Sequence, residues 1–519
     1  MSLSKTDIEQ LKKHGLTPEN IQQQLKIFSE GIPFVKIVKA GSIGNGIESI
    51  SEVDQNRLTE YYDLNKQKKE IVKFVPASGA ASRMFQFLFM FLNEYSPNKS
   101  TLDTFLNDKE NILIENFIKS LKDFAFFSSV QKKTKELYPD FEKASEGAGT
   151  YLLIKTMLVD KGLNFRNLPK GLIPFHKYET HTTTAFEEHL YESVYYASVN
   201  NNVKLHFTIA KKHLSFFEKE LDVIKNRVLK KTKTKLHVSY SFQKKETDTI
   251  AVSSDNTVFK NAKNECVFRP SGHGALIQNL NEIDADIVFI KNIDNVVAEQ
   301  YVDEVAYYKK VLGGKLLWLQ KKIFSYLVLL DKKNTSTEKL NEMKSFLRDE
   351  LNNRESILTS VTMKKIFNRP LRVCGVVKNT GAPGGGPFWV QNSNTLPTLQ
   401  IVEMSQIDSN NQDHQAIVES ATHFNPVDLV CGLKNYKGQK FDLSKFVDPK
   451  SGIITTKSQD GKSLKALELP GLWNGAMAYW NSAFVEVPLK TFNPVKMVND
   501  LLHKEHRPLL KIDSTQDGY

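Results

Sequence analysis

A β-branched run that breaks abruptly into small residues constrains the fold of this chain more than any other feature. Residues 71–75, Ile-Val-Lys-Phe-Val, predict a buried strand, and residues 76–84, Pro-Ala-Ser-Gly-Ala-Ala-Ser-Arg-Met, predict a loop that opens a helix. Such a loop exposes consecutive backbone N–H groups beside the positive end of the helix, so it can hold phosphate oxygens, and Arg83 would add a charged, forked donor. The same pattern is also typical of α/β proteins that bind nothing at this turn.

Composition limits the class of protein. A chain of 519 residues predicts two or three domains, or one elaborated domain, and its 40% apolar and 25% charged residues are typical of a soluble globular protein. The excess of 70 Lys and Arg over 59 Asp and Glu suits anionic substrates and is too diffuse to predict a nucleic-acid partner. Cys266, Cys374 and Cys431 lack paired spacing, which argues against a disulfide framework or a zinc site.

Targeting signals are also not recognisable in the sequence. The first residues contain no apolar signal region, and the longest apolar clusters, at 85–92 and 323–330, are too short to span a bilayer. We therefore expect a cytoplasmic protein without a membrane partner, whose oligomeric state the sequence leaves open.

Hydrophobic periodicity predicts the general plan. Residues 203–209 and 236–242 alternate like strands, and the helix between them completes a βαβ unit, which implies a parallel sheet. We predict an α/β fold in which a mixed, mainly parallel sheet is flanked by helices and carries a helical insertion. The expected segments are an N-terminal helical extension at 1–70, an α/β domain at 71–430 with the insertion at 84–168, and a C-terminal strand-and-helix region at 431–519 that completes the site.

Two polar residues at turns are candidates for ligand binding. Lys170 stands between Pro169 and Pro174, which fix the backbone around its mobile ammonium group. Gln243 follows the strand at 236–242, at the end of the strand where α/β sheets bind ligands. The alternatives are a plain turn before a helix for Lys170 and a turn-forming residue for Gln243.

A carboxylate and a second small-residue loop complete the candidates from the residues alone. Asp294 follows the apolar strand 287–290 and could hold Mg²⁺, which takes few protein carboxylates and relies on substrate phosphates for its other ligands. The alternative for Asp294 is a cap for a helix that starts near residue 296. The second loop, Gly272-His273-Gly274, also opens a predicted helix.

In their shared order, these stretches resemble the sugar nucleotidyltransferases, and especially the UDP-N-acetylhexosamine pyrophosphorylases. Lys490, in Pro-Leu-Lys at 488–490, competes with Lys496 as the match for a lysine near the C-terminal end of that family's pattern. Almost the whole chain is also similar to a family of Bacteroidetes proteins of unassigned function. The segments that carry the resemblance are the loop before residue 84, Leu-Pro-Lys-Gly-Leu-Ile-Pro at 168–174, Pro-Ser-Gly-His-Gly-Ala-Leu at 270–276, Ile-Asp-Asn at 293–295, Ile-Val-Glu-Met-Ser at 401–405 and Phe-Asn-Pro-Val-Lys at 492–496.

The resemblance implies a nucleotide-diphospho-sugar transferase fold and an enzyme that transfers a nucleotidyl group from a nucleoside triphosphate to a sugar 1-phosphate, releasing pyrophosphate. It implies catalytic roles for Arg83, Lys170 and Lys496, and a Mg²⁺ ion held by Asp294. The residues implied in nucleotide and sugar binding are Gly79, Ala80, Ala81, Ser82, Gln243, Gly272, His273, Gly274, Glu403 and Asn425.

Two departures from the family pattern leave alternatives open. The family loop reads Gly-Gly-x-Gly-Thr-Arg, whereas Ser78 and Ala81 replace glycines here, and their side chains would restrict the close approach of a phosphate. Lys170 follows Arg83 by 87 residues (170 minus 83), so the insertion must fold out from between two parts of one site. The alternatives are a protein that binds a nucleotide or nucleotide sugar without turnover, and a glycosyltransferase-like enzyme, whose Asp-x-Asp pair is matched by letter only at 284–286.

Overall fold

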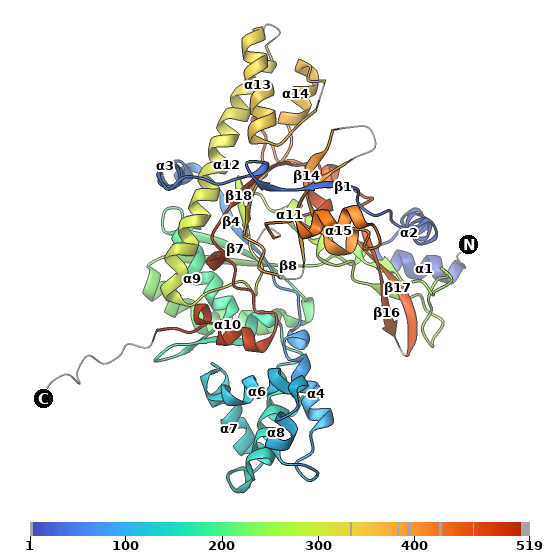
Figure 1. Cartoon of the computed structure of the whole chain (residues 1–519), viewed down its shortest axis with the longest axis vertical. Coiled ribbons are helices and arrows are strands. Elements are labelled where there is room, and N and C mark those ends of the chain that lie inside the picture. Colours follow the sequence, from blue (N-terminus) through green and yellow to red (C-terminus); the bar gives the residue numbers. More distant parts are fainter. Residues whose placement is uncertain are drawn as a thin grey trace, which may run out of the picture. The chain divides into compact units, whose positions relative to one another are not determined.

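The computed structural model describes residues 4–332, 335–355, 357–381, 384–391, 396–424, 428–459 and 461–509 (Figure 1). The chain forms two compact units, each assembled from three separate stretches. Unit 1 consists of Met1–Phe74, Ser241–Ile290 and Tyr308–Leu489, and unit 2 consists of Val75–Tyr240, Lys291–Tyr307 and Lys490–Tyr519. Neither unit therefore corresponds to one continuous segment of the sequence.

Unit 1 is built on a mixed sheet with the strand order β2-β3-β18-β12-β15-β11-β4. β11 runs parallel to β4, and β12 runs parallel to β18, whereas β15 is antiparallel to both β11 and β12. The predicted mixed sheet is confirmed. The pair β4–β11 on one side of β15 and the pair β12–β18 on its other side are each parallel. The strands are β2 (Ser42–Ile43), β3 (Gly46–Glu48), β4 (Ile71–Pro76, whose last two residues belong to unit 2), β11 (Ile287–Ile290), β12 (Leu371–Val376), β15 (Asp428–Gly432) and β18 (Asn481–Glu486).

Helices cover both faces of this sheet, which explains why the residues of its central strands are buried without alternation. Val288 and Ile290 join a hydrophobic cluster with Leu280 of α11 (Leu276–Glu282). Phe289 points to the other face and meets the ring of Tyr62 edge-on, at 6.0 Å between ring centroids. Tyr62 belongs to α3 (Glu52–Asn65), and the strands are therefore fully buried between helices.

The rest of unit 1 consists of a small sheet, two hairpins and peripheral helices. The order in the small sheet is β1-β13-β14, and β9 pairs with β10 and β16 with β17, each pair antiparallel. These elements are β1 (Ile37–Ala40), β9 (Thr249–Ile250), β10 (Phe268–Arg269), β13 (Gly385–Val390), β14 (Thr398–Glu403), β16 (Ile453–Gln459), β17 (Lys462–Glu468), α1 (Lys5–His14), α2 (Pro18–Glu30), α12 (Val302–Leu330, which begins in unit 2), α13 (Thr337–Glu350), α14 (Ser360–Phe367) and α15 (Gln412–Glu419).

Unit 2 contains the predicted βαβ unit. β7 (Asn202–Ile209) and β8 (Lys235–Phe242, whose last two residues belong to unit 1) are neighbours, and α10 (Leu214–Thr232) connects them. Asn202 contacts His237, and four residues later His206 contacts Ser239, so the two strands advance in the same direction. Before them come β5 (Pro174–Lys177), β6 (Thr182–Thr184) and α9 (Ala185–Ala197).

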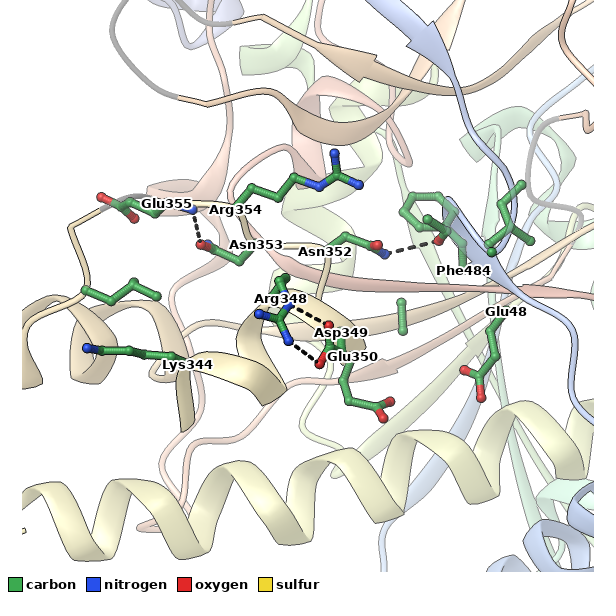
Figure 2. A pocket seen from close by; sticks show the side chains of 15 residues that line it. Glu48, Lys344, Arg348, Asp349, Glu350, Asn352, Asn353, Arg354, Glu355 and Phe484 are labelled. Atoms are coloured by element: carbon green, nitrogen blue, oxygen red, sulfur yellow. Dashed lines mark hydrogen bonds and ion pairs between the residues drawn. The ribbon is translucent and has the colours of Figure 1, made fainter. Parts of the chain in front are cut away.

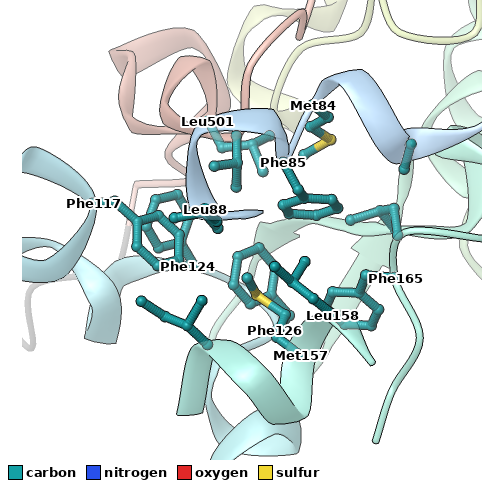
Figure 3. Packing of buried hydrophobic residues seen from close by; sticks show 14 of the residues in the cluster. Met84, Phe85, Leu88, Phe117, Phe124, Phe126, Met157, Leu158, Phe165 and Leu501 are labelled. Carbon is teal, nitrogen blue, oxygen red and sulfur yellow. The ribbon is translucent and has the colours of Figure 1, made fainter. Parts of the chain in front are cut away.

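The predicted helical insertion also lies in unit 2, where α4, α6, α7 and α8 pack together (Figure 1). Aromatic residues dominate its core, as Figure 3 shows, with Phe124 stacked on Phe126 at 5.1 Å between ring centroids. The same cluster includes Val296 and Val495, which lie outside the insertion in sequence. The helices are α4 (Gln86–Glu94), α5 (Leu102–Leu106), α6 (Ile112–Lys119), α7 (Phe127–Leu137) and α8 (Glu146–Leu158).

Some expected boundaries differ from the observed elements. Residues 1–70, expected to be a helical extension, also supply β1, β2 and β3 to sheets of unit 1, and the expected boundary at 430 falls inside β15. Within the described part of the chain, no helix combines the length and apolar character that crossing a bilayer requires.

Candidate functional site

Two lysines from distant parts of unit 2 meet one carboxylate oxygen. The ammonium group of Lys170 donates to Oδ2 of Asp294 at 3.1 Å, and that of Lys496 donates to the same oxygen at 3.0 Å. Lys170 also donates to the backbone carbonyl of Val495 at 2.7 Å. Residues selected from three separate sequence motifs are therefore brought to one point.

This group of charges is partly buried. The side chains of Asp294 and Lys170 are 10% and 13% exposed, whereas that of Lys496 is 61% exposed. Burial alone would raise the pKa of Asp294, but the charges of Lys170 and Lys496 outweigh it and hold that pKa below its ordinary value. Burial lowers the pKa of Lys170, and the charge of Lys496 adds to this effect while Asp294 opposes it. Two ammonium groups therefore meet at one carboxylate oxygen, and the more exposed of them, that of Lys496, is accessible to an anionic ligand.

Backbone contacts hold the segment of Lys496 beside Asp294. The N–H of Val495 donates to the carbonyl of Asp294 at 3.0 Å, and the N–H of Asn493 donates to Oδ1 of Asn295 at 2.9 Å. Asn295 is 2% exposed, so its buried amide joins the two segments inside the protein. Sequence reasoning did not select Asn295 or Asn493, although Asn295 directly follows Asp294.

Two further side chains fix the ends of these segments. Nε2 of His189, on α9, lies 3.2 Å from the carbonyl oxygens of both Asn292 and Ile293. A carboxylate oxygen of Asp500 accepts a hydrogen bond from the N–H of Lys496 at 2.7 Å. His189 gave no signal in the sequence, because its partners are backbone atoms 103 and 104 residues away along the chain.

The Pro-Lys turn is packed directly against the residue before Asp294. Residues 170–172 form a short 3₁₀ turn, and a Cβ added at Gly171 would lie 2.9 Å from Cγ1 of Ile293. Only glycine allows this close approach without displacement of a neighbour. The turn also bonds to the small-residue loop, because the N–H of Lys170 donates to the carbonyl of Gly79 at 3.1 Å. Lys170 is therefore not in a plain connecting turn.

The small-residue loop differs in part from its prediction. Residues 81–83 form a 3₁₀ turn and α4 begins only at Gln86, so the expected helix N-terminus does not open directly at the loop. The physical reason is that the N–H of Ala81 donates to the carbonyl of Leu168 at 3.0 Å, which ties the loop to the Pro-Lys segment. Gly79, Ala80, Ser82 and Arg83 are exposed, and Arg83 forms no ion pair within the described residues.

The side chain of Ala81 does not restrict the approach of a phosphate, because it is buried. Its methyl group is 0% exposed and joins the hydrophobic cluster of the insertion, so it points away from the open side of the loop. Ser78 is exposed, and a Cβ added at Gly79 would meet no atom within 4 Å. The loop therefore keeps an open surface although Ser78 and Ala81 stand where the pattern that it resembles has glycines.

The alternative role of Asp294 as a helix cap is wrong. The next helical turn starts at residue 299 with Ala298 before it, and α12 starts at Val302. Oδ1 of Asp294 is buried and has no hydrogen-bond partner among the described residues, and no group of three or more metal-ligating side chains was found among them. A single carboxylate with one oxygen unbonded fits Mg²⁺ that takes its other ligands from substrate phosphates and water.

The remaining predicted residues lie in unit 1, and the structure does not gather them as it gathers the lysines. Gln243 directly follows β8, and its amide nitrogen is buried without a partner among the described residues. Glu403 ends β14 and is half-buried. Asn425 lies outside the described residues.

The Gly-His-Gly loop has a packing role. A Cβ added at Gly274 would lie 2.1 Å from the carbonyl oxygen of Pro470, and Gly272 has a φ of 77°. His273 stacks on Trp473 at 4.7 Å between ring centroids, and its Nδ1 accepts the N–H of Leu472. Nδ1 of His273 is therefore an acceptor, and the loop is seated on residues 470–473 of the same unit.

The structure distinguishes the two candidate late lysines. Lys490, the competing match, forms an ion pair with Glu304, whereas Lys496 reaches Asp294. Sequence alone could not separate them because both follow a proline within a few residues.

A cavity of about 860 Å³ in unit 1 contains none of the predicted site residues. Figure 2 shows that Arg348 and Asp349 on its wall pair with each other, through bonds of 2.7 and 2.9 Å. Asn352 donates to the carbonyl of Gly46, and Arg354 stacks on Trp389 at 3.9 Å. Much of its polar lining is thus already engaged within the protein.

Residues 4–507 match the family model described as domain of unknown function DUF4301. The chain is a member of the DUF4301 family. Among curated proteins, no relative matches this DUF4301 protein.

Solved structures similar to this DUF4301 protein are UDP-sugar pyrophosphorylases. One is the uridine diphosphate N-acetylglucosamine pyrophosphorylase from Trypanosoma brucei in complex with an inhibitor, with 11% identity, a TM-score of 0.46 and coverage of 93% of this chain and 74% of that chain. Another is a mutant UDP-glucose pyrophosphorylase from Leishmania major in complex with UDP-glucose, with 12% identity, a TM-score of 0.41 and coverage of 96% and 79%. The confinement of the family to Bacteroidetes stays a prediction.

Proposed function

We propose that this DUF4301 protein transfers a nucleotidyl group from a nucleoside triphosphate to a sugar 1-phosphate, with release of pyrophosphate. The observation that carries the proposal is the convergence of Lys170 and Lys496 on Oδ2 of Asp294. Two ammonium groups that share one carboxylate oxygen can equally share a phosphate oxygen, which has the same charge and accepts the same hydrogen bonds.

In the proposed reaction, a phosphate oxygen of the sugar 1-phosphate attacks the α-phosphorus of the triphosphate. The bond from the α-phosphorus to the bridging oxygen breaks, and that oxygen leaves with pyrophosphate. This reaction needs positioning and neutralisation of charge more than covalent catalysis. Lys170 and Lys496 would bind the α-phosphate and the sugar phosphate, while the open loop at 79–83 would hold the outer phosphates, with Arg83 free to reach them.

Asp294 would hold Mg²⁺ through its carboxylate, with the remaining ligands supplied by substrate. When bound, Mg²⁺ supplies charge neutralisation at the phosphate oxygens. In this proposal the lysines turn from Asp294 toward the substrate, which leaves that carboxylate free to accept the metal. The roles in binding the base and the sugar that the resemblance implies for Gln243, residues 272–274, Glu403 and Asn425 stay predictions.

The test is pyrophosphate release from a panel of common nucleoside triphosphates and sugar 1-phosphates with Mg²⁺. We expect release with one pair, and a loss on the order of 10²–10³ in rate for Lys170→Ala and for Lys496→Ala. Lys490→Ala is the matched control, because Lys490 lies in the same segment but pairs with Glu304. Unchanged release in Lys170→Ala would contradict the proposal.

A binding-only role is the remaining candidate, and the replaced glycine at Ser78 is the observation that favours it. It predicts no release with any pair, while nucleotides still raise the melting temperature of the wild-type chain. In that case Lys170→Ala should abolish the nucleotide-dependent rise.

A further inference from the structure

Unit 2 holds a second cavity, of about 330 Å³, that none of the proposed catalytic residues lines. It is formed by the ends of β5 and β6, by α9 and α10, and by residues 299–302. Aromatic and carboxylate side chains share its wall. They are Tyr178, Tyr191, Tyr195, Glu188 and Glu299.

Glu188 gives this cavity a buried negative group. Its side chain is 3% exposed, and Oε1 accepts hydrogen bonds from Nδ1 of His176 at 2.8 Å, from the hydroxyl of Tyr178 at 3.0 Å and from the hydroxyl of Thr183. All the hydrogen bonds that the structure gives this carboxylate end on Oε1, and Oε2 receives none within the described residues. The bonds fix the carboxylate in place and leave its second oxygen available to a ligand.

His176 is held from behind by a second histidine. Its Nε2 lies 3.0 Å from Nδ1 of His506, whose pKa is lowered to about 3 by burial and by the neighbouring charge of His176. His506 is therefore neutral near pH 7. The hydrogen bond between the two rings fixes the orientation of the His176 ring, so Nδ1 of His176 stays directed at Glu188.

The ammonium group of Lys231 already lies against an aromatic ring that lines the cavity. Nζ of Lys231 lies 4.9 Å from the ring centroid of Tyr191 and 2.5 Å from Oε2 of Glu299. This arrangement is a cation–π contact closed by a carboxylate, the combination by which proteins recognise ammonium ligands. Lys231 pairs with Glu299, so Glu188 adds a further negative charge to the cavity.

We propose that this cavity binds a small organic ammonium cation. The positive head lies against the tyrosine faces, opposite Oε2 of Glu188, and Lys231 shows where such a charge is stable. Of the two lining carboxylates, Glu299 pairs with Lys231, and the free oxygen Oε2 of Glu188 is the group left to face a bound cation. The proposal is independent of the nucleotidyl-transfer reaction.

The test is calorimetric titration of the full chain with tetramethylammonium chloride, against sodium chloride at the same ionic strength and against tert-butanol, a neutral molecule of similar shape. We expect saturable binding of tetramethylammonium alone. Lys231→Ala removes the competing ammonium and should tighten binding by at least about threefold, and Tyr195→Leu should weaken it by about threefold, the size of one cation–π contact.

Lys230→Ala is the matched control, since Lys230 is the preceding residue of α10 and does not line the cavity. Glu188→Gln should abolish binding, and if that buried variant does not fold, Lys231→Ala and Tyr195→Leu still decide. Equal binding of tert-butanol, no saturable binding of tetramethylammonium, or weaker binding in Lys231→Ala would each overturn the proposal.

Discussion

The ammonium nitrogen of Lys170 lies 3.1 Å from Oδ2 of Asp294, although 124 residues separate them in the chain. Such a contact joins the Pro-Lys turn to the segment after β11. It fixes the relative placement of Lys170 and Asp294, the two residues to which the first two predictions apply.

Replacement of Asp294 by asparagine keeps the shape of the side chain and removes its charge. If Asp294 holds the metal as proposed, we expect pyrophosphate release to fall on the order of 10²–10³ in rate. Asp284→Asn is a matched control, because Asp284 is exposed and pairs with Lys434. Unchanged release in Asp294→Asn, or an equal loss in Asp284→Asn, would contradict this role of Asp294.

The rate of pyrophosphate release should decline on the alkaline side with an apparent pKa below 10.5, the ordinary value for lysine, because burial lowers the pKa of Lys170. If Lys170 binds phosphate as proposed, the sign follows from its charge, since a rise in pH removes its proton and weakens that contact. Lys170→Arg should move any residual alkaline decline to higher pH, because guanidinium stays charged. An identical decline in Lys170→Arg would assign it to another group.

Phe117→Ala should destabilise the insertion by about 3–5 kcal/mol, because the ring is 0% exposed and its loss leaves a cavity among other aromatic rings. Urea unfolding measures this change. Ile112→Ala on the same helix α6 is the control, since Ile112 is 52% exposed and should change the unfolding free energy by less than about 0.5 kcal/mol. Equal effects of both changes would mean that this core is not packed as described.

The buried pair of Lys291 and Glu192 should behave non-additively. Nζ of Lys291 lies 2.7 Å from Oε2 of Glu192, and the side chains are 0% and 2% exposed. Lys291→Met alone should cost up to about 3–5 kcal/mol, because it removes a cation from the buried carboxylate of Glu192, and adding Glu192→Leu should recover part of that loss. Urea unfolding of the two single variants and the double variant tests this, and simple addition of the two single losses would contradict it.

The strands and the helical insertion could be predicted from local pattern, because each depends on the burial of its own side chains. The strand at 71–75 appears as β4, and the apolar run at 85–92 appears as α4 with Leu88 and Phe91 buried. The antiparallel course of β15 could not be predicted, because strand direction depends on how the chain returns to the sheet and not on composition.

The lysines of the candidate site could be predicted from motifs, but the residues that position their segments could not. Lys170, Asp294 and Lys496 are charged residues in short segments that resemble a family, so they stand out in the sequence. Asn295 and His189 act on backbone atoms of distant segments, which no local pattern records. The helix expected directly after the loop failed for a similar reason, because a long-range bond to Leu168 draws Ala81 away from a helical start.

Val296 and Val495 belong to the hydrophobic cluster of the insertion, and each is next to or near a residue of the lysine–carboxylate group. The insertion therefore cannot be deleted without affecting the segments that carry Asp294 and Lys496. Its removal would expose both valines to water and free the backbone that carries Asp294 and Lys496. Natural variation deep in the aromatic core would then alter the proposed reaction through the placement of these two side chains, with no change in either residue.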